Sequence, residues 1–448
     1  MNRPNIILIL TDHFRRDTLR PDITPTLCQL AGSGTNFANA YSAAPLCQPA
    51  RNSIITGMHP TATGICGNQS PPIDDSLRDD TFMNHLQNAG YYTAMIGKHH
   101  YIDRYGIGMD VTADAEEIRK YGFDHVFQVN DDGENLHNDD EYTRWLADNG
   151  KLDQFRATDA WATSRHPFPA DETADGFIGV NGIRFVKDYK DDKPFYLNLS
   201  FIGPHPPFWH PAGFDVDLDQ ATDPIGVKES GDVRERRTHY LAKCRLIDHY
   251  VAGLLQALEE REMRQNTVIL FTADHGDCLG DFDIWDKRFF YEASVGVPLF
   301  VCGGQVESEA RQNGARISKA LVSHLDLYPT VLGLAGLDTE PDRRRPGRDL
   351  LRIARGADGG HKYVVSELAT AMMIRTGNWK LVFDPQAGGV QQLFNLVRDP
   401  DELDNLAGAA GYESITAQLV EKLLADKIRR SQFTHVKEEQ RLQRAHIA

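Results

Sequence analysis

Near its start the chain reads Asn5-Ile6-Ile7-Leu8-Ile9-Leu10-Thr11-Asp12-His13, an unbroken apolar run that ends at three polar residues. A strand buried on both faces of a parallel sheet has this composition. Similar runs occur at residues 195–201, 267–271 and 298–302, and a long helical pattern lies at residues 238–262. This alternation predicts an α/β fold with a large mixed, mostly parallel sheet sandwiched by helices.

The pattern of the sequence changes near residue 361. Short strand patterns follow at residues 363–368, 372–376, 379–384 and 391–396, and a helical pattern lies at about 415–427. We therefore expect a catalytic α/β domain over residues 1–350, a smaller C-terminal α+β subdomain over 351–434 and a charged tail over 435–448. Residues 101–175, rich in Asp, Gly and aromatic residues, are interpreted as an insertion over the edge of the sheet.

Composition limits the classes of function. The net charge of −16 argues against a general affinity for nucleic acid or for an anionic membrane, so an anionic substrate must meet locally placed cations. No apolar stretch approaches the length of a membrane span, and the first apolar run is too short for a signal peptide. The six cysteines are scattered, which favours neither a disulfide framework nor a structural zinc site. We expect a reduced, cytoplasmic protein.

Polar side chains follow two of the predicted strands. Asp12 and His13 come after the first run, and Asp274 and His275 come after the run at residues 267–271. Ligands bind at the carboxyl ends of strands in open α/β sheets, and carboxylates with imidazoles can hold a divalent cation. If the two strands are neighbours, these four residues form a metal site. Alternatively, the two aspartates only cap helices.

A second pattern is Cys47-Gln48-Pro49-Ala50-Arg51. Proline is favoured in the first turn of a helix, which places Cys47 at a helix N-terminus, where the backbone N–H groups favour an anion. Arg51, four residues later, can point to the same place. The pattern indicates an activated nucleophile, although a buried structural cysteine is the alternative reading for this motif alone.

Together these segments resemble the sulfatase family, which has the alkaline-phosphatase-like fold. The resemblance covers about residues 5–407 and rests on several segments in the family's order: residues 5–12, 47–51 with Thr56-Gly57, Gly97-Lys98-His99-His100, Pro204-His205-Pro206-Pro207, 272–277, Trp285-Asp286-Lys287, 375–381 and 393–407. One departure is the pair Asp12-His13, where most sulfatases carry two adjacent acids.

The resemblance implies that Cys47 is converted to formylglycine by a maturation enzyme, and that the hydrated aldehyde attacks the ester beside a divalent metal. Calcium is the family's usual metal, whereas an imidazole ligand at His13 suits manganese or zinc better; His13 could instead act behind the ligands. The implied metal ligands are Asp12, His13, Cys47, Asp274 and His275. The implied catalytic residues are Cys47, Arg51, Lys98, His100, His205 and Lys287.

The function expected from this resemblance is hydrolysis of a small-molecule or saccharide sulfate monoester to an alcohol and sulfate. Hydrolysis of phosphonate or phosphate esters is the alternative, and His13 mildly favours it; an unmodified, non-catalytic binding protein is a third. A homo-oligomer is compatible with the charged tail. The acids of the insertion, Asp131, Asp132, Asp139 and Asp140, are interpreted as a solvated loop rather than as the substrate mouth.

Overall fold

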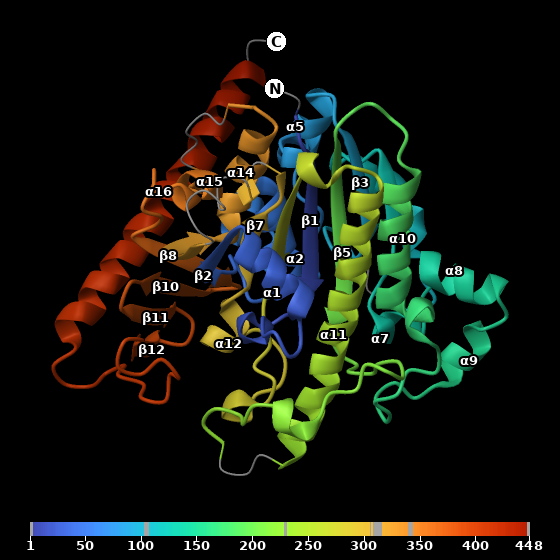
Figure 1. Ribbon diagram of the computed structural model, residues 1–448. Helices are drawn as coiled ribbons and strands as arrows, with labels where there is room; N and C mark the ends of the chain where they lie inside the picture. The colour runs from blue at the N-terminus through green and yellow to red at the C-terminus, as the bar shows by residue number, and fades with distance from the viewer. Residues whose placement is uncertain are drawn as a thin grey trace.

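The computed structural model describes residues 3–102, 107–227, 231–304, 306–307, 316–338 and 344–445 (Figure 1). Its main sheet has eight strands in the order β4-β3-β5-β1-β6-β7-β2-β8. β7 runs antiparallel to both of its neighbours, and the other pairs are parallel. The expected mixed, mostly parallel sheet is therefore confirmed. The strands are β1 (Asn5–Asp12), β2 (Thr35–Tyr41), β3 (Tyr92–Gly97), β4 (His125–Gln128), β5 (Phe195–Pro204), β6 (Thr267–Ala273), β7 (Leu299–Cys302) and β8 (Arg316–Ser323).

Helices cover both faces of this sheet. One layer contains α1 (Pro25–Ser33), α10 (Ala174–Asp188) and α11 (Gly231–Glu260), which pack against one another and lie in front of the strands in Figure 1. The opposite layer contains α2 (Cys47–Thr56), α5 (Phe82–Asn88) and α14 (Leu327–Leu334). Because both faces are covered, every residue of β1 is buried, as its unbroken apolar run predicts.

Residues 101–175 do more than cover the sheet edge. They contribute β4, which pairs with β3 and forms the edge strand. The other elements of this region are short helices: α6 (Ala115–Arg119), α7 (Asp132–Asn135), α8 (Glu141–Asp148) and α9 (Leu152–Ala157). Four short helices lie elsewhere: α3 (Pro60–Thr63), α4 (Asp75–Arg78), α12 (Glu292–Val295) and α15 (Leu350–Ala354).

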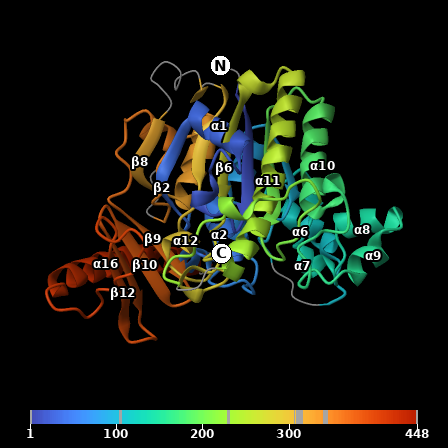
Figure 2. The ribbon, with the colours of Figure 1, turned by 60° about the horizontal axis from the view of Figure 1, so that its bottom comes forward.

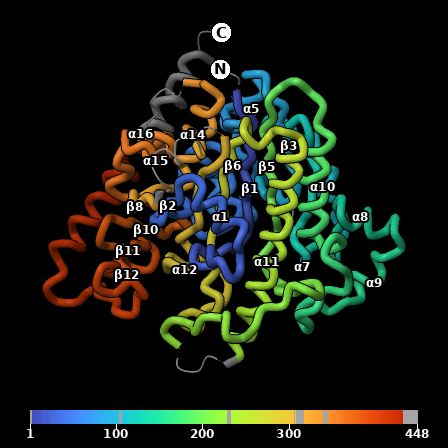
Figure 3. Tube along the Cα trace, viewed as in Figure 1, coloured from blue at the N-terminus to red at the C-terminus, as the bar shows by residue number. Residues whose placement is uncertain are grey.

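The C-terminal part of the chain forms a separate antiparallel sheet in the order β12-β11-β10-β9, on the side of β8 (Figures 2 and 3). Its strands are β9 (Tyr363–Leu368), β10 (Ala371–Thr376), β11 (Trp379–Asp384) and β12 (Gly389–Asn395), and α16 (Glu413–Ala445) packs on them. The helix expected at 415–427 lies within α16, which runs on into the region interpreted as a charged tail. The division of the chain at residues 350 and 434 stays a prediction. Among the described helices, none combines the length and the apolar character needed to cross a bilayer.

Candidate active site

The two predicted strands that carry acids are neighbours in the sheet. β1 pairs with β6 in parallel register, with Thr11 opposite Ala273. Their carboxyl ends therefore bring together Asp12, His13, Asp274 and His275, whose side chains are all fully buried. The backbone turns sharply at His13, which has a φ of +63°, and its N–H donates to Asp274 Oδ1 at 3.3 Å.

Three imidazoles, those of His13, His205 and His275, direct Nε2 into this centre because Nδ1 of each ring is held by an oxygen atom on its other side. His13 Nδ1 lies 2.8 Å from Asp277 Oδ2, His275 Nδ1 lies 2.8 Å from a backbone carbonyl, and His205 Nδ1 lies 2.7 Å from another. Carboxylate and carbonyl oxygens only accept hydrogen bonds, so each Nδ1 carries the proton when the ring is neutral. In the neutral rings each Nε2 then has a lone pair directed into the site. For His275, burial lowers the pKa, but Asp274 and Cys47 outweigh burial and raise it to about 9, so this ring also carries a proton on Nε2 at neutral pH until a cation displaces it.

Cys47 lies at the first position of α2, two residues before the start expected from Pro49. Its Sγ is 3.1 Å from His275 Nε2 and 3.6 Å from Asp12 Oδ1, and only 1% of the residue is exposed. Burial raises the pKa of the thiol, but the charges of Lys287, Lys98 and His275 outweigh burial and hold it well below its usual range. The surroundings of residue 47 therefore favour an anion.

Two buried cations, Arg51 and Lys98, form ion pairs with the carboxylates behind Cys47. Arg51 donates from Nε to Asp274 Oδ2 at 2.8 Å and lies 3.4 Å from Asp12 Oδ2. Lys98 Nζ lies 2.5 Å from Asp12 Oδ2 and 2.7 Å from Asp131 Oδ2. Lys98 follows Gly97, whose φ of +107° and contact with the Ser200 carbonyl leave no room for a Cβ. These ion pairs compensate for the burial of the acids.

Lys287 and His205 form the opposite wall. Lys287 Nζ lies 2.5 Å from His13 Nε2 and 3.1 Å from His205 Nε2, so the ammonium group bridges two imidazole lone pairs. His205 directly follows β5, in a loop, and lies between two cis X-Pro peptide bonds, Gly203-Pro204 and Pro206-Pro207. Lys243 of α11 donates to the carbonyl oxygens of His205 and Pro207, at 2.9 and 3.3 Å, and so holds this loop in place.

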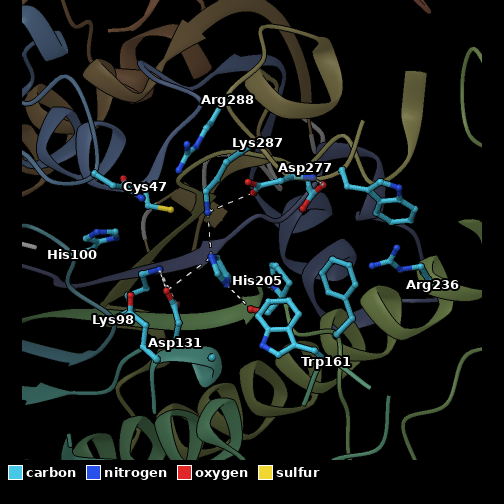
Figure 4. A pocket seen from close by; sticks show the side chains of 17 residues that line it. Cys47, Lys98, His100, Asp131, Trp161, His205, Arg236, Asp277, Lys287 and Arg288 are labelled. Carbon is cyan, nitrogen blue, oxygen red and sulfur yellow. Dashed lines mark hydrogen bonds and ion pairs between the residues drawn. The ribbon is translucent and has the colours of Figure 1, made fainter. Parts of the chain in front are cut away.

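A cleft of about 490 Å³ opens above these groups (Figure 4). Its base contains Cys47, Lys98, His100 and Lys287. Farther out its walls are aromatic and charged, and include Trp161, Phe208, Trp285, Arg236 and Arg288. The structure thus brings all the residues expected from the resemblance, Asp12, His13, Cys47, Arg51, Lys98, His100, His205, Asp274, His275 and Lys287, to one site.

The interpretation of the insertion acids as a solvated loop was wrong for three of them. Asp131 and Asp132 are buried and pair with Lys98 and Lys243, while Asp140 is buried as the N-cap of α8. Only Asp139 fits that interpretation, because its side chain is 55% exposed. Burial of the first two depends on β4, which places them beside the site.

Asp277 is a further residue of the site that the sequence patterns do not identify. It is 1% exposed, and its carboxylate accepts from His13 Nδ1, Leu279 N at 2.7 Å and Asp286 N at 3.1 Å. The motif residues 272–277 contain it, but its role depends on contact with His13, which follows the neighbouring strand β1.

The donor atoms suit a divalent cation. One potential ligand atom from each of Asp12, His13, Cys47 and His275 lies within 4.8 Å of the others, and all four residues are buried. Asp274 Oδ1 lies 3.6 Å from His275 Nε2, so a second carboxylate is close to this group. Carboxylate oxygens and imidazole Nε2 atoms are the ligands expected for a hard or borderline metal ion.

Family models and known proteins match most of this chain. A family model described as "Sulfatase" matches residues 4–337, and one described as "N-sulphoglucosamine sulphohydrolase, C-terminal" matches residues 280–429. A choline-sulfatase of Rhizobium meliloti (strain 1021) is 30% identical over 90% of this chain and 82% of its own length. An arylsulfatase of Clostridium perfringens (strain 13 / Type A) is 27% identical over 92% of both chains.

Solved structures share the fold. The phosphonate monoester hydrolase of Agrobacterium radiobacter superposes with a TM-score of 0.78 at 21% identity, covering 96% of both chains. A putative sulfatase from Bacteroides thetaiotaomicron VPI-5482 gives a TM-score of 0.72 at 22% identity, covering 96% of this chain and 93% of that one. With the match of the family model over residues 4–337, these findings show that the chain belongs to the sulfatase family of sulfuric ester hydrolases.

Proposed function

We propose that this protein hydrolyses a sulfate monoester to an alcohol and inorganic sulfate, with a nucleophile formed from Cys47. The observation that carries the proposal is the position of Cys47 at the base of the cleft. Its thiol lies beside Asp12 and His275, and the cations Lys98 and Lys287 line the base of the cleft with it. These two cations can bind an anionic ester next to residue 47.

Formylglycine at position 47 would supply, as its hydrate, one hydroxyl that attacks and a second that allows the sulfate to be released. Arg51 and Lys98 favour the ionised form of Asp12, and Arg51 opposes the burial that raises the pKa of Asp274 to about 6. His100 hydrogen-bonds to the side chain of residue 47, so it can take the proton that must leave when sulfate is released.

Lys287 and His205 act on the substrate from the other wall. Burial lowers the pKa of His205 to about 3, so its neutral Nε2 accepts from the Lys287 ammonium group rather than competing with it for the proton. Lys287 can then stabilise the sulfuryl oxygens and donate to the leaving oxygen. A positioned proton donor of this kind contributes about 10²–10⁴ in rate.

A divalent metal held by Asp12, His13, Asp274 and His275, together with the side chain at position 47, would stabilise negative charge on the attacking oxygen. Asp277 holds the proton of His13 on Nδ1, so Nε2 keeps the lone pair that ligation would use and that here faces Lys287; the Gly276 carbonyl holds the proton of His275 on Nδ1 in the same way. Two imidazoles in the group favour manganese or zinc, while the carboxylates also suit calcium.

Hydrolysis of phosphonate or phosphate esters is the second candidate. The observation that favours it is His13, which places an imidazole where a further acid would add negative charge beside a phosphoryl group. A tetrahedral phosphoryl centre also suits the same cations.

The test uses protein produced together with a formylglycine-generating enzyme. The peptide that contains Cys47 should be about 18 Da lighter than the thiol form, as expected for oxidation of the thiol to an aldehyde. Matched aryl sulfates and aryl phosphonates should then be assayed, with choline sulfate included because one relative is named a choline-sulfatase. A higher kcat/KM for the sulfates supports the first proposal, a higher value for the phosphonates supports the second, and full activity without modification refutes the nucleophile.

A further inference from the structure

The wall of the cleft farthest from Cys47 carries a guanidinium group, that of Arg236, for which the described residues provide no acidic partner. Arg236 lies on α11, and its guanidinium carbon is 4.1 Å from the centroid of the Trp285 ring. Within the described ranges of the chain Arg236 forms no ion pair, whereas Arg234 and Arg237 on the same helix both do. Figure 4 shows Arg236 and Cys47 on opposite sides of the pocket.

The acids of the cleft do not neutralise Arg236, because they already have partners. Asp131 lies 2.7 Å from Lys98, Asp277 accepts from His13 at 2.8 Å, and Asp286 lies 3.7 Å from Lys287. Glu134, which also lines the cleft, is not free either. Among the cleft-lining residues that the structure describes, no acid is thus left to pair with Arg236, and a ligand can supply that charge.

The neighbours of Arg236 suit the organic part of an ester. Trp161, Phe208 and Trp285 line the same outer region, and Trp161 is 69% exposed. Their flat faces can pack against a ring of the substrate. Stacking on Trp285 also restricts the guanidinium group of Arg236, so less conformational entropy is lost when its planar fork binds an anion.

We propose that the organic part of the substrate carries a second anionic group, a carboxylate or a further sulfate, which Arg236 binds at the outer wall. The proposal rests on the proposed function, since it assumes that the ester to be cleaved lies at Cys47. It makes Arg236 a residue that determines specificity, while the reacting groups stay at the base of the cleft.

Three phenyl sulfates test this proposal, bearing a para carboxylate, hydroxyl or trimethylammonium group. Each substituent is joined through a methylene, so that the acidity of the leaving phenol stays similar. The mature wild-type enzyme should show the highest kcat/KM for the carboxylate ester. Arg236→Gln should lower kcat/KM for the carboxylate ester about tenfold more than for the hydroxyl ester, as expected for loss of a charged hydrogen bond. A bis-sulfate ester shows whether a second sulfate replaces the carboxylate.

Arg184→Gln is the matched control, because Arg184 is exposed on α10 and does not line the cleft. It should alter none of the ratios. Equal losses for the carboxylate and hydroxyl esters in Arg236→Gln, or a wild-type preference for the trimethylammonium ester, would overturn the proposal. If none of the esters is cleaved, the proposed function fails instead. Calorimetric binding of the corresponding arenesulfonates then tests the anion site at Arg236 separately. Equal affinities for the carboxylate and hydroxyl compounds would refute that anion site.

Discussion

Asp277→Asn changes one buried atom and should weaken metal binding. All three groups that approach the Asp277 carboxylate are donors: His13 Nδ1, Leu279 N and Asp286 N. An asparagine offers one accepting oxygen. If that oxygen keeps the two backbone N–H groups, its NH₂ faces His13 Nδ1 and forces the imidazole proton onto Nε2, the atom that would ligate the metal.

Loss of such a partner behind a ligand typically lowers metal affinity 10–100-fold, or about 1.4–2.7 kcal/mol. The assay is a titration of metal-free protein with buffered Mn²⁺ and Ca²⁺, followed by calorimetry. Asp283→Asn is the control, since Asp283 is an exposed acid of the same loop. Thermal melts in chelator separate lost affinity from lost stability. An affinity of Asp277→Asn within about twofold of wild type would refute the assignment of His13 as a ligand oriented by Asp277.

Three further substitutions test other parts of the structure. Cys47→Ala should abolish turnover and leave the melting temperature nearly unchanged, and substantial residual activity would exclude Cys47 as the nucleophile. Lys243→Met should lower kcat about 10–100-fold, because the loop that carries His205 loses its hydrogen bonds to Lys243. It should also lower the free energy of unfolding by about 3–5 kcal/mol, because Asp132 loses its ion pair. Adding Asp132→Asn should recover part of the unfolding free energy but not kcat, and no recovery would contradict the ion pair. Burial raises the pKa of Glu367, but neighbouring cations outweigh burial and hold this pKa well below its usual range. The carboxylate therefore stabilises the fold at pH values above its ordinary pKa of about 4.3, and this stabilisation is lost as the pH falls toward the lowered pKa. Glu367→Gln should therefore reduce the loss of unfolding free energy at acid pH in urea titrations, and an unchanged slope would argue against the ion pair of Glu367 with Arg430 at 2.8 Å.

The sequence predicts the centre of the sheet well and its edge poorly. β1 and β6 are unbroken apolar runs, and that pattern is a direct consequence of burial on both faces. β4 has only four residues, partly exposed, and lies in an Asp- and Gly-rich region. Its strand conformation depends on pairing with β3, a contact that no local pattern reports.

The same distinction applies to the site. Residues at strand ends and at the start of α2, such as Asp12 and Cys47, are found because local structure fixes their positions. Asp131 and Asp277 act through partners distant in sequence, Lys98 and His13, so only the assembled sheet shows that they are buried and engaged. The stacking of Arg236 on Trp285 and its place in the cleft both depend on contacts outside its own helix.

The central position of β1 has a consequence for synthesis on the ribosome. β1 pairs with β5 and β6, so the sheet around it cannot close until residue 273 has been made. Every residue of α2 is buried once the fold is complete, so an enzyme that has to bind the chain on both sides of Cys47 would act earlier. Some 220 residues separate Cys47 from the start of β6, which at about 5–20 residues per second gives a window of roughly 10–45 s. If Cys47 is modified as proposed, translation speed over this interval would set how much of the protein is modified before the fold encloses the chain around position 47.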